Sequence, residues 1–405
     1  MQTNISEQFL NNPEIQDAET ILRSCVHCGF CTATCPTYQL LGDELDGPRG
    51  RIYLIKQVLE GNEISSKTQS HLDRCLTCRS CETTCPSGVR YGRLVEIGRE
   101  IVDQQVPRNL LQRIPRILLR KIVPYPQRFS PIYRLGLLFR PVLPASIKRK
   151  LPVPQKSGST SIMTKERRML VLQGCVQSVV TPQTNLAAER ILQKLDIELI
   201  TAPDAGCCGA VSHHLSAAEE GLDFMRRNID AWWPYIEQGA EAIIITASGC
   251  GTVVKDYAEL LKHDSQYADK AKQVSLMARD ISEILRDEDL TSLTINHPET
   301  RIAFHSPCTL QHGQQLSGVA EDILRKAGFT LTEVQDPHLC CGSAGTYSIL
   351  QAKLSQQLLD NKLSALQSGQ PDIIATANIG CQMHMASKAQ LPVKHWLEVL
   401  DEHLV

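Results

Sequence analysis

Two stretches of this sequence, CVHCGFCTATCP at residues 25–36 and CLTCRSCETTCP at residues 75–86, are copies of one motif, with every cysteine displaced by 50 positions. Each copy reads C-x2-C-x2-C-x3-C-P. The first three thiolates of such a motif can surround one face of a [4Fe–4S] cubane, while the fourth is directed to another cluster. The doubled motif therefore predicts two clusters. The first quartet of ligands would be Cys25, Cys28, Cys31 and Cys85, and the second would be Cys75, Cys78, Cys81 and Cys35.

A pair of zinc sites is the alternative, because CxxC pairs also build zinc ribbons. Zinc needs only four ligands, however, so it gives no reason for a doubled pattern in which Pro36 and Pro86 turn the chain away after the last cysteine. Between the copies, RGRIYLIKQVLEGN at residues 49–62 is expected to be helical. The N-terminal region is therefore predicted to be a helical two-cluster domain.

A second, longer repeat accounts for the other cysteines. Its first copy holds Cys175, Cys207, Cys208 and Cys250, and its second copy holds Cys308, Cys340, Cys341 and Cys381. The first three are displaced by 133 positions and the fourth by 131. The strings GCCGA and LCCGSAG share a CCG core. The second part of the chain is thus predicted to be a duplicated domain.

Each copy of the long repeat has the pattern of an α/β domain. Apolar runs such as MLVLQGC (169–175) and RIAFHSPC (301–308) lead into stretches of helical period, and AIIITASGC (242–250) stops at glycine and cysteine. Alternating strands and helices imply a parallel sheet, whose ligand sites lie beyond the carboxyl ends of the strands. The expected fold is α+β overall: a helical two-cluster ferredoxin-like domain followed by two duplicated α/β cysteine-rich domains with parallel sheets.

The four cysteines of each copy could gather at a sheet edge and hold a metal centre, since thiolate clusters select iron–sulfur or zinc. The alternatives are buried cysteines beside tight glycine turns, or a redox dithiol pair. Vicinal Cys207 and Cys208 fit the geometry of a simple disulfide poorly. Nearby histidines could ligate, orient a quinone or tune a cluster. They are His213, His214, His305, His312, His338 and His384.

The composition is that of a globular protein with two or three domains, because 405 residues at 42% hydrophobic content can bury several cores. A net charge of -2 gives no indication of nucleic-acid binding. The polar N-terminus, MQTNISEQFLNNPEIQDAET, indicates a cytoplasmic protein, where cysteines bind metals more often than they form disulfides. No apolar run reaches the roughly 18 residues of a membrane span. Any membrane contact is expected to be peripheral.

A basic, proline-rich linker joins the two repeat systems. Residues 104–165 contain 13 lysines and arginines and no aspartate or glutamate. Arginines alternate there with apolar stretches, a pattern typical of an interfacial helix. We expect the linker at 106–165 either to dock on anionic lipid headgroups or an acidic partner surface, or to be a solvated strap around the chain's own domains. The remaining domain bounds are expected at 1–105, 166–295 and 296–405.

Several catalytic motifs are absent. The sequence has no GxGxxG after a first strand and no GxxxxGK[ST], so neither dinucleotide nor triphosphate binding is indicated. It also has no GxSxG elbow and no HExxH. The chain therefore offers no visible place to take a hydride from an organic substrate. Electron relay is the function that remains.

The two cysteine motifs, together with GCCGA, SGCG, LCCGSAGTY and TANIGC, resemble those of the iron–sulfur subunits of bacterial glycolate oxidase, or glycolate dehydrogenase, over nearly the whole chain. The resemblance implies a complex in which FAD-binding partner subunits oxidise glycolate to glyoxylate. This chain would carry two [4Fe–4S] clusters, and no FAD, and relay electrons to a quinone-type membrane acceptor. No substrate chemistry is expected from the isolated chain, and its expected place is the cytoplasmic face of the inner membrane.

The CCG copies also resemble the cysteine-rich domains of heterodisulfide reductase, where such motifs can hold an unusual cluster. The closing motif there is CxxC, whereas Cys250 and Cys381 stand alone in this sequence. Two alternative functions follow. One is the equivalent subunit of an L- or D-lactate or glycerol-3-phosphate dehydrogenase, which uses similar CCG subunits. The other is a thiol or disulfide reductase whose vicinal cysteines bind substrate sulfur.

Overall fold

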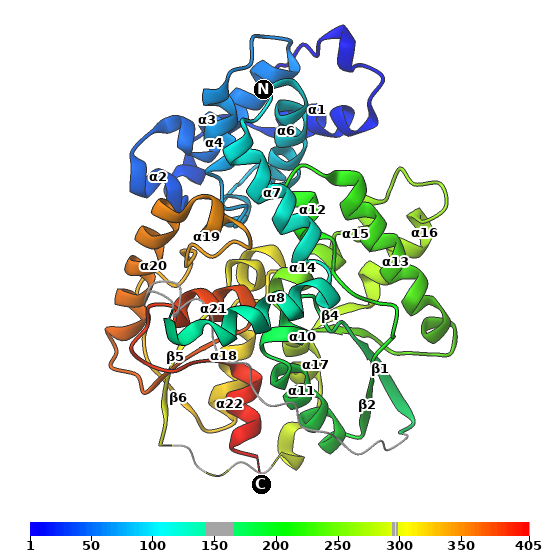
Figure 1. Cartoon of the computed structure of the whole chain (residues 1–405), viewed down its shortest axis with the longest axis vertical. Helices are drawn as coiled ribbons and strands as arrows, with labels where there is room; N and C mark the ends of the chain where they lie inside the picture. Colours follow the sequence, from blue (N-terminus) through cyan, green and yellow to red (C-terminus); the bar gives the residue numbers. More distant parts are fainter. Residues whose placement is uncertain (143–164, 294–295, 297–298, 405) are drawn as a thin grey trace.

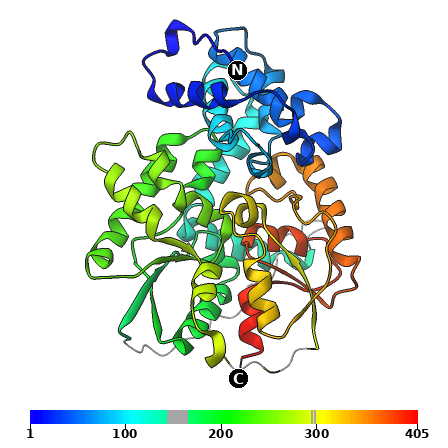
Figure 2. The ribbon, with the colours of Figure 1, turned by 180° about the vertical axis from the view of Figure 1, so that it is seen from behind.

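The computed structural model describes residues 1–142, 165–293, 296 and 299–404. A helical N-terminal domain lies above two α/β halves that stand side by side (Figures 1 and 2). The predicted α+β fold is confirmed, including the two parallel sheets. No helix among the described residues is both long and apolar enough to cross a bilayer.

The N-terminal domain is built from short helices around one core. These are η1 (Glu7–Phe9), α1 (Pro13–Ser24), η2 (Phe30–Thr32), α2 (Pro36–Leu41), η3 (Glu44–Asp46), α3 (Pro48–Leu59), α4 (Ser66–Asp73), α5 (Ser80–Thr83) and α6 (Tyr91–Gln105). Pro13, Pro36 and Pro48 each begin a helix at the first position, where the missing N–H costs nothing. The helix predicted between the cysteine motifs is confirmed as α3.

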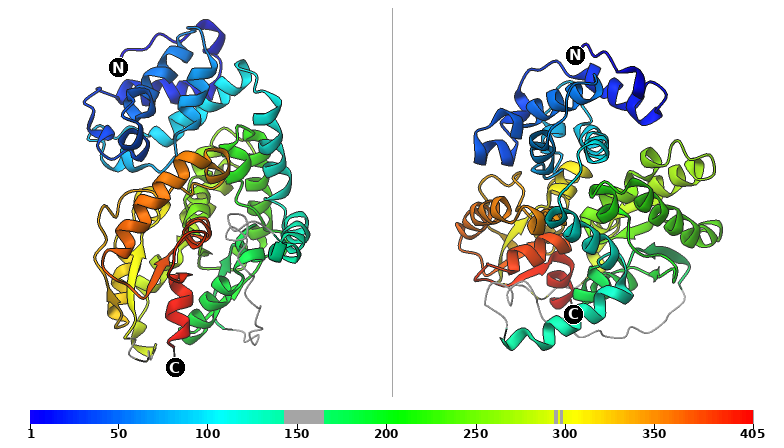
Figure 3. Two further views of the ribbon diagram at one scale, coloured as in Figure 1. Left: turned by 60° about the vertical axis from the view of Figure 1, so that its left-hand side comes forward. Right: turned by 45° about the horizontal axis from the view of Figure 1, so that its top comes forward.

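The described part of the linker forms two helices, α7 (Leu110–Ile122) and α8 (Pro126–Leu138), followed by the turn η4 (Arg140–Val142). Figure 3 shows α7 descending from the N-terminal domain along the outside of the halves, with α8 lying across below it. The rest of the predicted linker, from residue 143 to 164, lies outside the described residues.

The first half contains the strands β1 (Arg167–Val171), β2 (Ile197–Ile200), β3 (Ile243–Ile245) and β4 (Ala278–Asp280). They form a parallel sheet in the order β2-β1-β3-β4. Its helices are α10 (Gln177–Val180), α11 (Gln183–Lys194), α12 (Ala210–His214), α13 (Ala218–Glu237), α14 (Ser248–Lys255), α15 (Tyr257–Leu260), α16 (Ala268–Met277) and α17 (Ile281–Asp287), with η5 (Leu290–Ser292) after them. All of β3 is buried, as expected for a parallel strand covered on both faces.

The second half repeats this arrangement. Its strands are β5 (Arg301–His305), β6 (Thr330–Leu331), β7 (Ile373–Thr376) and β8 (Val393–His395), in the order β6-β5-β7-β8. Its helices are η6 (Thr309–Gly313, a π-helical turn), α18 (Val319–Lys326), α19 (Tyr347–Leu350), α20 (Ala352–Gln367), α21 (Ile379–Ala386) and α22 (Trp396–Glu402). Because both sheets have the same strand order and direction, the predicted duplication is confirmed.

The two halves share one hydrophobic core. Ile191 and Ile244 of the first half pack in the same buried group as Phe304 and Trp396 of the second. At its edge, Arg190 of α11 pairs with Asp401 of α22. The halves therefore stabilise each other, and the shared core holds the two sheets in a fixed position relative to each other.

Candidate iron–sulfur sites and the junction between domains

Each copy of the first cysteine motif bends through two residues in the left-handed conformation. They are His27 (φ +56°) and Gly29 (φ +86°) in the first copy, and Thr77 (φ +52°) and Arg79 (φ +58°) in the second. Both pairs occupy the same two motif positions. Residues other than glycine adopt this conformation only where the surrounding structure holds them there. These bends turn the first three cysteines of each copy toward one space.

The first predicted quartet lies around one pocket of about 430 Å³. Cys25 ends α1, Cys28 and Cys31 follow on the loop into η2, and Cys85 arrives from the second motif after α5. Ile52 of α3 forms part of the remaining wall. The fold thus brings together four thiols that are up to 60 positions apart in the sequence.

The second predicted quartet surrounds a smaller pocket of about 300 Å³. It is lined by Cys35 from the first motif and by Cys75, Cys78 and Cys81 from the second. Cys81 lines both pockets, so the two candidate cluster sites adjoin. The exchange of the fourth cysteine between the motifs is the arrangement that the spacing predicts, while ligation itself stays a prediction.

The electrostatics of these thiols fit a cationic iron cluster. Burial, reinforced by neighbouring thiolates, raises the pKa of Cys31 to about 11. Burial and nearby cysteines also raise the pKa of Cys78 and of Cys81 well above that of a free thiol. Crowded thiols of this kind ionise together only when a metal centre compensates their charge. Four cysteines per pocket are the donor set of a [4Fe–4S] cluster.

Cys75 has a distinct environment within the second pocket. Burial opposes its ionisation, but the positive charges of Arg51 and Arg99 outweigh this effect and lower its pKa. The sulfur also accepts a hydrogen bond from the Thr77 amide at 3.3 Å and one from the Tyr91 hydroxyl at 3.6 Å. Hydrogen bonds and positive charge at cluster sulfurs raise the reduction potential. A cluster held at the second site would therefore have a higher reduction potential than one without these contacts.

In the first half, the four CCG cysteines form a continuous row. Cys207 is hydrogen-bonded to the thiols of Cys175 and Cys208, and Cys208 is in turn hydrogen-bonded to Cys250. Cys175 follows β1, and Cys250 lies on α14 after β3, so the row sits beyond the carboxyl ends of the strands. The structure thus gathers the set that the sequence predicted.

The second half gathers its four cysteines in the same way and adds a histidine. The Cys308 and Cys340 sulfurs are 3.8 Å apart, and Cys341 is hydrogen-bonded to Cys340 and Cys381. A ring nitrogen of His305, at the end of β5, lies within 4.8 Å of the sulfurs of Cys341 and Cys381. The His305 ring is 2% exposed, and neither of its nitrogens has a hydrogen-bond partner.

The glycine of each CCG motif is required by the tight turn after the vicinal cysteines. Gly209 has φ +91°, and a Cβ there would lie 2.6 Å from the carbonyl oxygen of Gly221. Gly342 has φ +84°, and its Cβ would lie 2.7 Å from the carbonyl oxygen of Ser355. Only glycine tolerates both the conformation and the close approach. The motif therefore fixes where the vicinal thiols point.

The second ferredoxin-type pocket lies against the row of the second half. Cys78 interacts electrostatically with Cys308 and Cys340. Cys308 and Cys340 also pack in one buried group with Leu76 and Tyr347. The candidate thiols therefore continue from the first pocket, through the second, to the CCG row of the second half.

The remaining histidines singled out in the sequence have other partners. The two ring nitrogens of His312 lie 2.9 Å from the Thr83 hydroxyl and 3.1 Å from the carbonyl oxygen of His338. His384 Nε2 lies 3.0 Å from the Ser355 hydroxyl. The hydrogen bonds of these side chains therefore hold neighbouring loops and helices in place.

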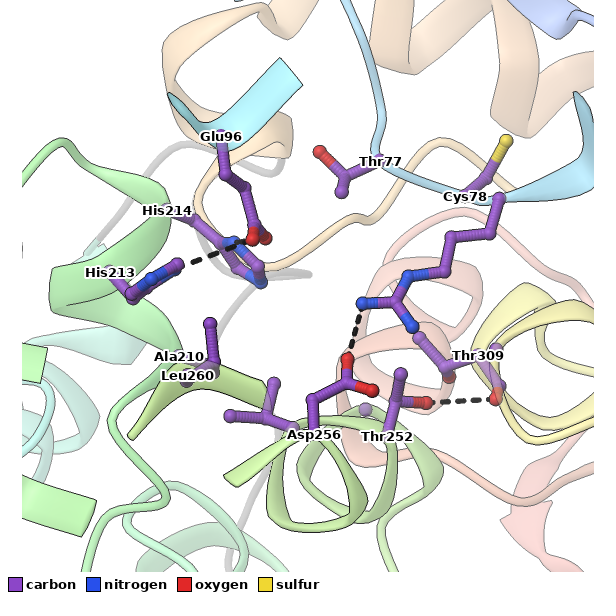
Figure 4. A pocket seen from close by; sticks show the side chains of 14 residues that line it. Thr77, Cys78, Glu96, Ala210, His213, His214, Thr252, Asp256, Leu260 and Thr309 are labelled. Carbon is purple, nitrogen blue, oxygen red and sulfur yellow. Dashed lines mark hydrogen bonds and ion pairs between the residues drawn. The ribbon is translucent and has the colours of Figure 1, made fainter. Parts of the chain in front are cut away.

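A chamber of about 470 Å³ opens where the N-terminal domain meets both halves. Figure 4 shows Glu96 reaching down toward His213 and His214, with Asp256 and Thr252 on the opposite side. Arg79 forms an ion pair with Asp256 across the domain boundary. Sequence patterns gave no signal for Glu96, because its partners lie more than 100 positions away.

Comparisons with protein families agree with this architecture. The model of a 4Fe-4S dicluster domain matches residues 21–89, and the model of a cysteine-rich domain, CCG, matches residues 169–255 and 302–386. The "Glycolate oxidase iron-sulfur subunit" of Escherichia coli is 57% identical over 405 residues, which cover 100% of this chain and 99% of that protein. The chain belongs to the family of glycolate oxidase iron–sulfur subunits. It is accordingly an iron–sulfur protein with an electron-transfer role.

More distant relatives share the same parts. The "Probable glycolate oxidase iron-sulfur subunit" of Bacillus subtilis is 30% identical, with 94% of this chain and 91% of that protein covered. "Lactate utilization protein A" of the same species is 25% identical over 54% of this chain and 93% of its own length. This chain is thus similar to lactate utilization protein A over about half of its length.

Proposed function

We propose that this chain is the electron-relay subunit of a flavin-dependent glycolate oxidase complex. The observation that carries the proposal is the continuity of closely packed cysteines: the pockets of the two quartets adjoin at Cys81, and Cys78 of the second quartet lies against the row of the second half. Electrons from FAD-bearing partner subunits, which oxidise glycolate to glyoxylate, would enter at this series and leave to a quinone-type acceptor. The isolated chain supplies no substrate chemistry.

The substrate assignment rests on the relatives. A full-length relative at 57% identity carries glycolate oxidase in its name. Lactate or glycerol 3-phosphate would be the substrate of an equivalent complex, and the similarity to lactate utilization protein A keeps lactate as the second candidate. To decide, the chain is purified anaerobically with its flavin subunits, and cluster bleaching is followed after each substrate is added. Glycolate should reduce the clusters fastest, whereas faster reduction by lactate would identify lactate as the substrate of the complex.

Within this function, the two CCG halves have different roles. The second half offers four thiols plus His305, which has no hydrogen-bond partner and lies close enough to Cys341 and Cys381 to serve as a further ligand. The first half has Leu172 at the position equivalent to His305, since the repeat spacing is 133. We expect an additional iron–sulfur site in the second half and none, or a weaker one, in the first. The alternative, a dithiol-based disulfide reductase, would need reactive vicinal thiols, but Cys207, Cys208, Cys340 and Cys341 are all buried.

Iron and sulfide analysis with EPR tests both proposals. About eight irons per chain correspond to the two ferredoxin-type clusters alone. More iron, lost in Cys340→Ser and retained in the matched Cys207→Ser variant, would support a cluster in the second half. About eight irons in all three proteins would show that the CCG halves are scaffold. Zinc in place of iron would overturn the relay function as a whole.

We also propose that α7 and α8 bring the chain to the cytoplasmic face of the inner membrane. Among the described residues, nine of the sixteen exposed large apolar side chains lie on these two helices and the residue after them. They are Leu110, Leu111, Ile114, Ile117, Leu118, Ile132, Leu135, Leu138 and Phe139. An exposed apolar stripe of this size favours an interfacial role.

A further inference from the structure

Glu96, His213 and His214 converge at the wall of the junction chamber, outside the cysteine sites. The ligand atoms of the three side chains all lie within 4.8 Å of one another. Glu96 comes from α6 of the N-terminal domain, and the histidines come from α12 of the first half. Glu96 is 8% exposed and His213 is 9% exposed. Three metal-ligand side chains from two domains thus meet at a largely buried point.

The geometry of the three groups is that of ligands around a shared centre. His214 Nδ1 lies 3.1 Å from Glu96 Oε1, at the distance of an ion pair. His213 Nδ1 lies 3.8 Å from Glu96 Oε2. Zinc bonds of about 2.0–2.2 Å place neighbouring ligands of a tetrahedral ion roughly 3.3 Å apart. The two measured separations bracket this value.

The comparison of the two halves shows that the histidine pair is a local feature. With the repeat spacing of 133, the residues equivalent to His213 and His214 are Thr346 and Tyr347. The vicinal cysteines and the CCG glycine are present in both halves. The histidines therefore are not needed to form the CCG turn. They occur in the half whose α12 faces Glu96.

The surroundings hold α12 in place and leave room beside the three ligands. Ser212 donates a hydrogen bond of 2.9 Å to Glu220, which also pairs with Arg120 and Lys121 of α7. These contacts anchor the helix that carries the histidines. The chamber of about 470 Å³ lies on the side that the ligands face. A fourth coordination position would therefore be open to water or a small anion.

We propose that Glu96, His213 and His214 bind one divalent transition-metal ion, for which zinc is the best match, at the junction of the N-terminal domain and the first half. Two imidazoles and one carboxylate are a donor set that zinc takes with its fourth position left open. The ion ties α6 to α12 and so fixes the second ferredoxin-type pocket, where Cys78 also lines the chamber, relative to the CCG halves. This site uses none of the candidate cluster thiols and is independent of the substrate.

The test uses the full chain, purified anaerobically with its iron–sulfur sites loaded, and zinc alone as the probe. Equilibrium dialysis with metal analysis gives zinc per chain, and zinc K-edge absorption distinguishes nitrogen and oxygen ligands from sulfur without interference from iron. The wild type should bind one zinc in a nitrogen and oxygen shell. Glu96→Gln and His214→Gln should each weaken binding by at least about tenfold. The control His403→Gln, at a C-terminal histidine that is in no group of potential metal ligands among the described residues, should leave it unchanged.

Three results would overturn the proposal: no bound zinc in the wild type, zinc with a sulfur shell only, or a nitrogen and oxygen shell that survives both substitutions. Circular dichroism and iron content establish that each variant is folded. If Glu96→Gln disturbs the domain boundary, His214→Gln carries the test, because its side chain is 37% exposed and its loss leaves little unfilled space.

Discussion

At the residue scale, Gly342 shows how the CCG turn depends on an absent side chain. A side chain at this position would meet two costs. The φ of +84° strains any residue other than glycine, and an added Cβ would lie 2.7 Å from the Ser355 carbonyl oxygen. We expect Gly342→Ala to lower the free energy of unfolding by about 3 kcal/mol, since strained backbone alone accounts for roughly 1–2 kcal/mol. Gly318→Ala is the matched control, with φ +81° and open space around its Cβ. Urea unfolding measures the free energy of unfolding of both variants. Equal losses of stability would show that the close approach of the Cβ to the Ser355 carbonyl oxygen adds nothing to the backbone strain.

His395 makes the stability of the second half depend on pH. Its Nε2 lies 3.0 Å from the carbonyl oxygen of Thr246 in the other half, and its Nδ1 accepts from the Leu397 amide at 3.2 Å. Burial lowers the pKa of His395 to about 4. The unfolded chain, with a pKa near 6.5, therefore takes up the proton first as pH falls.

The expected result is a loss of stability on the order of 3 kcal/mol between pH 6.5 and pH 4, and none above pH 7. Replacing the imidazole in His395→Asn should flatten the dependence within this window. Urea midpoints at pH 7 and pH 5 for both proteins measure it. A slope that is unchanged in the variant would assign the effect to other groups.

At the scale of elements, α7 presents two unlike faces. Three of its four basic residues pair with other parts of the chain: Arg116 pairs with Asp73 at 3.0 Å, and Arg120 and Lys121 pair with Glu220 at 3.0 and 2.7 Å. Neutralising them would loosen the helix from its own protein and so would not isolate lipid binding. The contacts of these basic residues agree with the strap that the sequence offered as one alternative, while the interfacial helix stays a proposal for the apolar face.

The apolar face of α7 is therefore the one to change. Leu111, Ile114 and Leu118 are exposed by 85%, 51% and 52%. Replacing all three by glutamine should lower binding to anionic vesicles at least about tenfold, because each apolar side chain inserted contributes roughly 1 kcal/mol or more. Vesicle flotation measures this, with Leu276→Gln on α16 as the control for a single exposed leucine elsewhere. Undiminished binding in the triple variant would remove the membrane role of this helix.

At the scale of the whole molecule, the shared core makes the two CCG halves one folding unit. Buried side chains of β1, α11 and β3 pack against those of β5, α18 and α22. A fragment of residues 166–293 would expose that surface to water. We expect it to lack cooperative unfolding and to bind hydrophobic dyes, while residues 166–404 unfold in one transition. Two separate transitions in the longer fragment would show that each half is stable alone.

The sequence by itself determined the parts of this protein that repeat or follow a short period. The spacing of 50 between the cysteine motifs, the spacing of 133 between the CCG copies, and the strand and helix patterns are local signals, because each depends on residues close in the chain. They were sufficient for the helical domain, the two parallel sheets and the candidate cysteine quartets. The sequence also singled out His305, His213 and His214, but it did not indicate which residues lie beside them.

Only the tertiary structure decided what these parts face. The sharing of Cys81 between two pockets, the contact of Cys78 with Cys308 and the meeting of Glu96 with His213 each join residues from separate elements. No periodicity records such contacts, because they depend on how the domains dock. The same docking buries His305 beside two thiols and pairs basic residues of α7 with other parts of the chain. Packing between domains therefore determined where the candidate sites connect.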